Sequence, residues 1–359
     1  MQQSRRQFLA AAAASSAAAL SGCLEGPGTG GAVTTSGVET VDGPTPPAAD
    51  NDLHIPYEFA ELRSNVVSGG VPKDGIPSID DPQFKDADDA EIPGGDPVFG
   101  VVRDGEAKAY PQDVLVHHEI VNDELAGDAV AVTYCPLTGT VQGFERGDVE
   151  FGVSGRLLNA NLVMYDRSTD SRWPQMLATA IDGPLEGQTL REFRLVWTTW
   201  GSWRRAHPDT QLLTSGTDYL RDYDDDPYGS YNPQRGYYAS DDYLFEPLAE
   251  DDRDTAKSVV LGARTGEEAV AFDKSVLLNE RVLECEGTST PFVAVADRSL
   301  ATGFVYENPD ERDVTSADDG YRVDGEVHEP DDLPLDRVLA WDAMWFAWAG
   351  YYPDTAYVG

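Results

Sequence analysis

Short runs of alternating apolar and polar residues dominate the chain, and they predict more strands than helices. Residues 98–110 alternate around a glycine-bearing turn, which predicts a hairpin. Residues 111–122 start with a proline and carry apolar side chains at helical spacing, so we expect a short helix there. Residues 129–134 predict a buried strand, and residues 151–165 predict a pair of strands. The pattern is typical of a strand-rich α+β domain.

Three tryptophans lie at helix-like spacing in residues 195–206, at positions 197, 200 and 203. A repeat of large apolar side chains every three residues indicates one face of a helix. We therefore interpret these tryptophans as a packed helix face, not as part of a ligand site.

The apolar pattern occurs twice along the chain. Residues 98–115 recur in residues 260–277 with the same spacing, and the closing string HPDT at 207–210 recurs as YPDT at 352–355. Repeated blocks in the same order indicate an internal duplication. We expect two pseudo-equivalent halves, copy one at 98–215 and copy two at 260–359, joined by a connector at 216–259. The connector is rich in Tyr and Asp, and its run of three aspartates at 224–226 is expected to be a solvated face.

The N-terminus has the features of an export signal. Arg5 and Arg6 precede an alanine-rich apolar run at residues 9–20, which is too short to span about 30 Å of hydrocarbon. Two small residues and Cys23 follow the run, and residues 1–22 resemble a twin-arginine lipoprotein signal that leaves this cysteine lipidated. Residues 23–52 are rich in Gly, Pro, Ser and Thr and predict a flexible tether. We expect residues 53–359 to be a domain on the extracellular face of the cell membrane, with the membrane as its partner through Cys23.

Composition narrows the class of protein further. The 359 residues include 26 Lys and Arg against 64 Asp and Glu, a formal net charge of −38. With 41% hydrophobic residues the chain can bury a core, so the charge does not indicate disorder. The charge excludes nucleic acid as a partner, because that binding depends on basic residues that neutralise phosphates. Such acidity resembles that of salt-in haloarchaeal proteins, and three cysteines exclude a disulfide-stapled scaffold.

The two halves differ in the side chains that can do chemistry. Copy one has His117, His118 and Cys135, whereas copy two has Asn279 and Asp297 at the positions of the first and the last. Copy two is also shorter in the region that matches residues 154–175. Features that both halves share are expected to be scaffold, so we expect the functional site in copy one.

Five strings carry a resemblance to a known family: GGVPKDGIPSIDDP at 69–82, HHEIVND at 117–123, TYCPLTGT at 133–140, VSGRLLNANLVMYDRSTDSRWPQ at 153–175 and HPDT at 207–210. Together they resemble the DUF3179 family, over nearly all of the chain from about residue 53. The family has no established function. The resemblance therefore implies a shared architecture and supplies no catalytic residues.

Cys135 follows an apolar strand and precedes a turn, which leaves several interpretations open. As a free cysteine it fits a buried, inert position, or a disulfide with Cys285. Alternatively, His118 activates its thiolate and Glu119 or Asp166 orients the imidazole, because a thiolate near neutral pH needs a neighbouring base or cation. The hydroxyl of Ser154, or backbone N–H groups beside Gly139 or Gly155, would then stabilise an oxyanion.

A soft metal site is a further possibility for the same region. Thiolate, imidazole and thioether ligands suit copper, and the candidates are His117, His118 and Cys135 with Met164 or Met176. Neighbouring histidines do not share one helix face, so we expect only one of them to face the cysteine.

Four more side chains are candidates for ligand binding. Arg156 and Arg167 stand out among so many acids and suit a carboxylate or phosphate, while Trp173 and Gln175 suit an apolar or sugar ring. Surface ion pairs are the simpler interpretation of each arginine. We expect thiol- or metal-dependent chemistry on a small molecule or surface component, with a non-catalytic solute- or ion-binding lipoprotein as the alternative.

Overall fold

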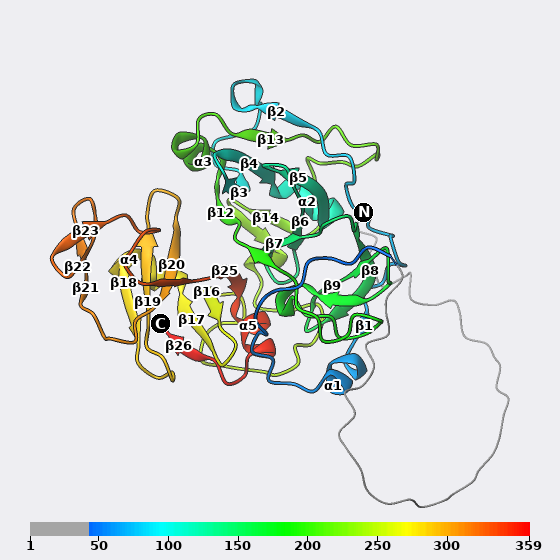
Figure 1. Ribbon diagram of the computed structural model, residues 1–359. Helices are drawn as coiled ribbons and strands as arrows, with labels where there is room; N and C mark the ends of the chain where they lie inside the picture. The colour runs from blue at the N-terminus through cyan, green and yellow to red at the C-terminus, as the bar shows by residue number, and fades with distance from the viewer. Residues whose placement is uncertain (1–42) are drawn as a thin grey trace, which may run out of the picture. The chain divides into compact units, whose positions relative to one another are not determined.

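The computed structural model describes residues 43–359, which are rich in strands and have few, short helices (Figure 1). The predicted signal, the lipidation of Cys23 and most of the predicted tether lie outside the described residues. Within residues 43–359, the helices are all too short, or too polar, to cross a bilayer.

The elements predicted for residues 98–165 are present, with one difference. The hairpin, the buried strand and the strand pair are confirmed, but the helix ends at His118 and residues 120–125 form a strand. Glu119 takes a left-handed conformation (φ 59°), which ends the helix and turns the chain into that strand. The elements are β3 (Pro97–Arg103), β4 (Glu106–Pro111), α2 (Gln112–His118), β5 (Ile120–Leu125), β6 (Asp128–Cys135), β7 (Thr140–Glu145), β8 (Phe151–Leu158), β9 (Asn161–Asp166), β10 (Arg172–Pro174), η3 (Gln175–Leu177), β11 (Glu192–Phe193), β12 (Val196–Thr199), α3 (Trp200–Ala206) and β13 (Gln211–Leu213).

A second series of strands and short helices follows the connector. Its elements are β16 (Val259–Arg264), β17 (Ala269–Asp273), α4 (Lys274–Glu280), β18 (Val282–Cys285), β19 (Phe292–Asp297), β20 (Thr302–Glu307), β21 (Val314–Ala317), β22 (Gly320–Val323), β23 (Glu326–His328), β24 (Asp336–Val338), β25 (Ala340–Met344), α5 (Trp345–Tyr351) and β26 (Ala356–Val358). Before copy one lie α1 (Phe59–Ser64), β1 (Val67–Ser68), β2 (Phe84–Asp86) and η2 (Ala87–Asp89).

The two series build sheets with matching strand orders. One sheet runs β12-β3-β4-β13-β2, and its counterpart runs β25-β16-β17-β26. In the first sheet β13 pairs with β4 in parallel, and in the second β26 pairs with β17 in parallel. A second sheet runs β11-β7-β6-β5, and its counterpart runs β24-β20-β19-β18. The sheet β1-β8-β9-β10 has no counterpart of this kind, and it contains the strings at which copy two is shorter.

The short helices α3 and α5 place one tryptophan each in the same setting. The indole N–H of Trp203 donates to Thr210 Oγ1, and that of Trp348 donates to Thr355 Oγ1, both at 3.0 Å. Trp197 does not belong to the helix face that the spacing predicted. It lies on β12, because the helix begins only at position 200.

Glycine is required where these two tryptophans cross the opening strands. A Cβ on Gly100 would lie 2.3 Å from the ring of Trp203, and a Cβ on Gly262 would lie 2.3 Å from the ring of Trp348. Such close approach is a reason for glycine within a strand.

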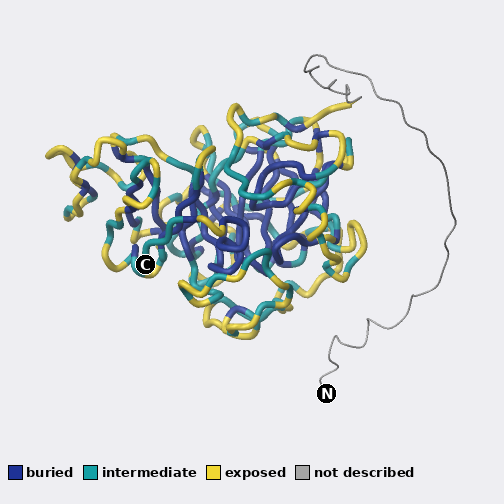
Figure 2. Tube along the Cα trace, turned by 90° about the horizontal axis from the view of Figure 1, so that it is seen from below, coloured by how far each residue is buried: buried dark blue, intermediate teal, exposed yellow. Residues whose placement is uncertain are grey.

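The connector contributes to the core, although Asp224 and Asp225 of its aspartate run are exposed, as expected, and Asp226 is half-buried. It holds β14 (Gly229–Tyr231), β15 (Gln234–Gly236) and η4 (Tyr237–Ala239), and its tyrosines at 228, 231, 237 and 238 pack against the apolar clusters of copy one and of α5. Figure 2 shows the buried chain in the interior and exposed chain along the outer loops. The connector therefore helps to shape the interior beside α2.

Candidate functional site

Cys135 ends β6 and lies in an apolar cluster. Its side chain is 1% exposed, and its Sγ is 3.9 Å from the carbonyl oxygen of Ala160. Burial raises the pKa of the thiol to about 11, and the nearby charge of Glu119 adds to the shift. Cys135 and Cys285 are both free thiols in different clusters, so the structure does not support the disulfide alternative.

His118 is engaged away from Cys135. Its Nδ1 lies 2.7 Å from the carbonyl oxygen of Pro77, and its Nε2 lies 2.7 Å from the hydroxyl of Tyr223. Desolvation lowers the pKa of the imidazole, which favours the neutral form. The neighbouring His117 packs its ring edge-on to Tyr223, and its Nε2 is buried without a partner among residues 43–359. Neither imidazole is hydrogen-bonded to the thiol.

The predicted copper ligands do not converge. Among residues 43–359 no group of three or more His, Cys, Asp or Glu side chains is close enough to hold a metal ion. Met164 and Met176 are fully buried in separate apolar clusters.

Glu119 is the predicted site residue that does lie near Cys135. It is 7% exposed. Burial raises its pKa to about 8, so the carboxyl is largely protonated at neutral pH. A neutral acid beside a neutral thiol does not generate a nucleophile.

Cys135 should therefore react slowly in the folded protein. Because its pKa is raised from 9.0 to about 11, the thiolate population near neutral pH falls about a hundredfold. Steric shielding of the buried sulfur slows the reaction further. We expect iodoacetamide to label Cys135 at least about a hundredfold more slowly in native protein than in denaturant. Peptide mass spectrometry measures both rates. Equal rates, or fast native labelling at neutral pH, would contradict the burial and restore the nucleophile hypothesis.

Asp166 fixes a loop within the protein. It is fully buried, and its carboxylate accepts the backbone N–H of Thr169 at 2.6 Å, the hydroxyl of Thr169 at 2.7 Å and the indole N–H of Trp173 at 3.1 Å. Because Asp166 is fully buried and all three bonds go to the chain itself, a ligand or substrate has no access to its carboxylate. The structure places Asp166 and Trp173 together.

Gln175 belongs to a closed polar network between β6, β7 and β9. Its side-chain oxygen accepts from Thr140 Oγ1 at 2.7 Å and from Asn161 Nδ2 at 2.8 Å, and its amide donates to Thr133 Oγ1 at 2.9 Å. Asn161 also donates to Thr138 Oγ1 at 3.0 Å. All five residues are buried, and such mutually satisfied groups specify the packing of the strands.

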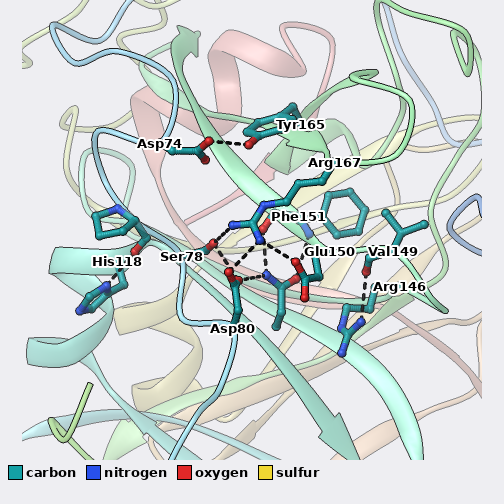
Figure 3. A network of polar contacts seen from close by, with 12 residues as sticks. Asp74, Ser78, Asp80, His118, Arg146, Val149, Glu150, Phe151, Tyr165 and Arg167 are labelled. Atoms are coloured by element: carbon teal, nitrogen blue, oxygen red, sulfur yellow. Dashed lines mark hydrogen bonds and ion pairs between the residues drawn. The ribbon is translucent and has the colours of Figure 1, made fainter. Parts of the chain in front are cut away.

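Arg167 is paired with acids of the chain itself. Its guanidinium donates to Asp80 at 2.7 Å, to Glu150 at 2.6 Å and to Ser78 at 2.8 Å (Figure 3). Hydrogen bonds and charges of these acids outweigh desolvation and raise the pKa of Arg167. The simpler interpretation, an ion pair at the surface, fits this arrangement.

Arg156 and Ser154 lie at an irregularity of β8. The register between β8 and β9 shifts there. Ser154 Oγ donates to the carbonyl oxygen of Val163 and accepts a hydrogen bond from the backbone N–H of Arg156. Arg156 itself is exposed. The serine hydroxyl is therefore part of the bulge and not adjacent to a nucleophile.

A pocket of about 360 Å³ opens where the connector meets the start of α2. Its walls come from residues 91–97, from Gln112 and Asp113 at the start of α2, and from connector residues 223–232. Tyr223, one wall of the pocket, is the residue that contacts His118. The pocket thus connects directly to the HHEIVND string.

Hydrogen bonds hold the acid at the base of this pocket. Asp226 Oδ2 accepts from Gln112 Nε2 at 2.9 Å and from the hydroxyl of Tyr238 at 3.0 Å, and Oδ1 accepts the backbone N–H of Tyr228 at 2.7 Å. Tyr231, another wall residue, stacks on Tyr238 with ring centroids 3.8 Å apart. One carboxylate and one aromatic ring are therefore held in place before any ligand binds.

Carboxylates dominate the charge of the pocket. Glu91, Asp96, Asp113, Asp224 and Asp226 line it, and no Lys, Arg or His does. No ion pair joins any of these five acids to a basic side chain in the described part of the chain. Burial raises the pKa of Asp113 to about 6, and the charges of Asp96 and Asp224 add to the shift.

Comparison with known families gives one match, which covers this whole site. Residues 73–355 match the model of a family described as a protein of unknown function, DUF3179. The chain belongs to the DUF3179 family. The match confirms the resemblance read from the five strings and includes Cys135, Asp166 and every wall of the pocket. The DUF3179 chain matches none of the curated proteins and none of the solved structures.

None of the residues that line the pocket was among the predicted site residues of this DUF3179 domain. Gln112 and Asp113 immediately precede the apolar face of α2, and the other walls lie in residues 91–97, ahead of most of copy one, and in the connector. The signal that was available is the density of tyrosines in the connector. A larger hollow of about 590 Å³ lies beside α1. Its walls come from residues 52–63 and 179–189, and none of these residues belongs to the five family strings.

Proposed function

We propose that the domain binds a small cationic solute in the acidic pocket between α2 and the connector, without transforming it. The observation that carries this proposal is that five carboxylates line one pocket with no basic side chain among its walls. A cationic ligand relieves the mutual repulsion of these acids, whereas an anionic ligand increases it. This corresponds to the solute-binding alternative.

Aromatic side chains support an organic cation as the ligand. Tyr223 and Tyr231 line the pocket with the acids, and a cation over an aromatic face gains electrostatic stabilisation. Asp226 is already held by three hydrogen bonds, so little ordering is needed on binding. No three of the described acids are arranged for a metal ion, so the observations favour an ammonium group.

The thiol alternative has less support. A reactive cysteine needs a depressed pKa and a base within hydrogen-bond reach, whereas burial raises the pKa of Cys135 and His118 contacts Pro77 and Tyr223 instead. The metal alternative lacks converging ligands within residues 43–359.

The setting of the pocket completes the proposal. We infer that the N-terminal signal leads to lipidation at Cys23 and holds the domain on the extracellular face of the membrane, where it meets solutes. We also infer that the two halves arose by duplication, an idea that the matching strand orders and the paired Trp–Thr contacts support. The acidic surface is then an adaptation to concentrated salt, as in haloarchaeal proteins.

Filling the pocket should abolish binding. We expect choline to raise the Tm of the wild type and to leave unchanged the Tm of Ser230→Trp, because the indole occupies space within the pocket walls. Thermal unfolding and calorimetry in molar potassium chloride measure the effect, with the neutral carbon isostere of choline as control ligand. Ser215→Trp, at an exposed position immediately before the connector, is the matched control and should behave as wild type.

The acids give a second measurement on the same site. Asp113→Asn keeps an oxygen for the backbone N–H of Val114 but removes one negative charge, so choline affinity should fall about tenfold. Binding to the wild type should weaken as the pH falls below about 6, because protonation neutralises Asp113. If choline, a guanidinium compound and a polyamine all leave Tm unchanged, the proposed function is wrong.

A further inference from the structure

One wall of the acidic pocket is a loop, residues 218–225, that touches the domain through few side chains. All of its residues are exposed except Tyr223, which is half-buried and lines the pocket beside Asp224. Hydrogen bonds inside the loop join the backbone N–H groups of Asp224 and Asp225 to Asp222. Such local bonds shape the loop but do not attach it to the domain. The position of this wall therefore depends on what Tyr223 contacts.

His118 is the contact that holds Tyr223. The hydroxyl of Tyr223 lies 2.7 Å from His118 Nε2, and the two rings are stacked with centroids 5.7 Å apart. The ring of Tyr219, the other aromatic residue of the loop, also lies against His118, at a centroid distance of 5.5 Å. His118 is fully buried at the end of α2, so it is a fixed point on which the loop rests.

The carbonyl group of Pro77 determines which nitrogen of His118 carries the proton. A carbonyl oxygen only accepts, so Nδ1, 2.7 Å away, is the N–H donor (Figure 3). Desolvation lowers the pKa of His118 and favours the neutral ring, which leaves Nε2 to accept from the hydroxyl of Tyr223. The oxygen of Tyr223 accepts in turn from Thr217 Oγ1 at 2.6 Å. Donors and acceptors are matched from Thr217 to Pro77, and this fixes the orientation of Tyr223.

The helix end itself does not require a histidine. The helices α2 and α4 are both followed by a residue with positive φ, Glu119 at 59° and Arg281 at 75°. The last residue of α4 is Glu280, which is exposed, whereas His118 is fully buried. Because the same turn forms without a histidine, the identity of His118 is explained by its contact with the pocket wall.

We propose that His118 is a positioning residue for the acidic pocket: through the hydroxyl of Tyr223 it holds residues 218–225 in place as a wall. This inference rests on the proposed solute-binding function. A wall that is ordered before binding costs the ligand less free energy, so loss of this hydrogen bond should weaken binding. His118 itself is not among the walls of the pocket.

A double-mutant cycle tests the link between the two residues. His118→Phe keeps a ring but has no nitrogen, and Tyr223→Phe keeps the wall ring but has no hydroxyl, so each should bind choline about tenfold more weakly. The double variant should bind no more weakly than His118→Phe, because both changes remove the same hydrogen bond. Calorimetry in molar potassium chloride measures the four affinities. Wild-type affinity in His118→Phe, or additive losses in the double variant, would overturn the proposal.

His207→Phe is the matched control for the loss of an imidazole. The ring of His207 packs on Trp203, with centroids 4.1 Å apart, and His207 is not a wall of the pocket. Phenylalanine keeps that ring contact, so choline should bind this variant as it binds the wild type. A loss of affinity equal to that of His118→Phe would show a general effect of the substitution and would count against the proposal.

Trypsin gives a measurement that needs no ligand. Arg221 is exposed in the loop, and Arg298 is exposed in the turn between β19 and β20. A loop that has lost its anchor opens more often, so cleavage after Arg221, relative to cleavage after Arg298, should be about tenfold faster in His118→Phe and in Tyr223→Phe. An unchanged ratio would overturn the role of His118. If instead the ratio rises but the wild type binds none of the cations, the anchor is supported and the proposed function is wrong.

Discussion

Replacing Asp166 by alanine is expected to lower the free energy of unfolding by about 4 kcal/mol, because three charge-assisted hydrogen bonds are lost. The variant leaves two N–H groups without their partner, the indole N–H of the fully buried Trp173 and the backbone N–H of the half-buried Thr169. Chemical denaturation with tryptophan fluorescence measures the change. We expect choline still to bind the folded fraction, because Asp166 is not a wall of the pocket.

Asp148→Ala is the control for this prediction. Asp148 is exposed and makes no described side-chain contact, so its removal should change the free energy of unfolding by less than about 0.5 kcal/mol. If Asp166→Ala is as stable as this control, the carboxylate is not structural, and Asp166 returns as a candidate for acid or base chemistry.

Glu119 should make the stability of the domain depend on pH. Its pKa is raised from 4.5 to about 8, so the folded state keeps the proton to a higher pH than the unfolded chain. The contribution is fully present below pH 4.5 and is lost as the pH rises through about 8. Glu119→Gln stays neutral at every pH. Relative to wild type, it should therefore gain about 3 kcal/mol between pH 5 and pH 8.

Denaturation at several pH values measures this difference. Glu124→Gln, an exposed neighbour on β5, should follow the wild type within about 0.5 kcal/mol. Parallel curves for Glu119→Gln and wild type would show that the carboxyl is solvated in the folded state and would remove it from the core.

The strands were predictable because their signal is local. Alternation with period two and a glycine-bearing turn located β3, β4 and β6 from a few residues each. The end of α2 was not predictable in the same way. It depends on the left-handed conformation of Glu119, a non-glycine residue that propensity does not place there. Trp197 was assigned to a helix because spacing of three fits both a helix face and the end of a strand that leads into it.

The candidate chemical site was predicted from residue types, but the directions in which the side chains point decided whether the site exists. Cys135, His118 and Glu119 belong to neighbouring strings, but only the thiol and the carboxyl lie near each other. His118 is drawn to the carbonyl of Pro77 and to Tyr223, which lie far from it in the sequence. A sequence pattern carries no information on such partners.

By itself the sequence determined the strand-rich class, the family and the acidic character, because each of these depends on composition or on short-range pattern. Tertiary structure alone decided which groups are free to act. The fold itself supplies the hydrogen-bond partners of Asp166, Gln175 and Arg167. By contrast, the pocket where the connector packs on α2 is lined by Asp113 and Asp226. Burial and long-range hydrogen bonds set both outcomes, and they depend on how distant segments meet.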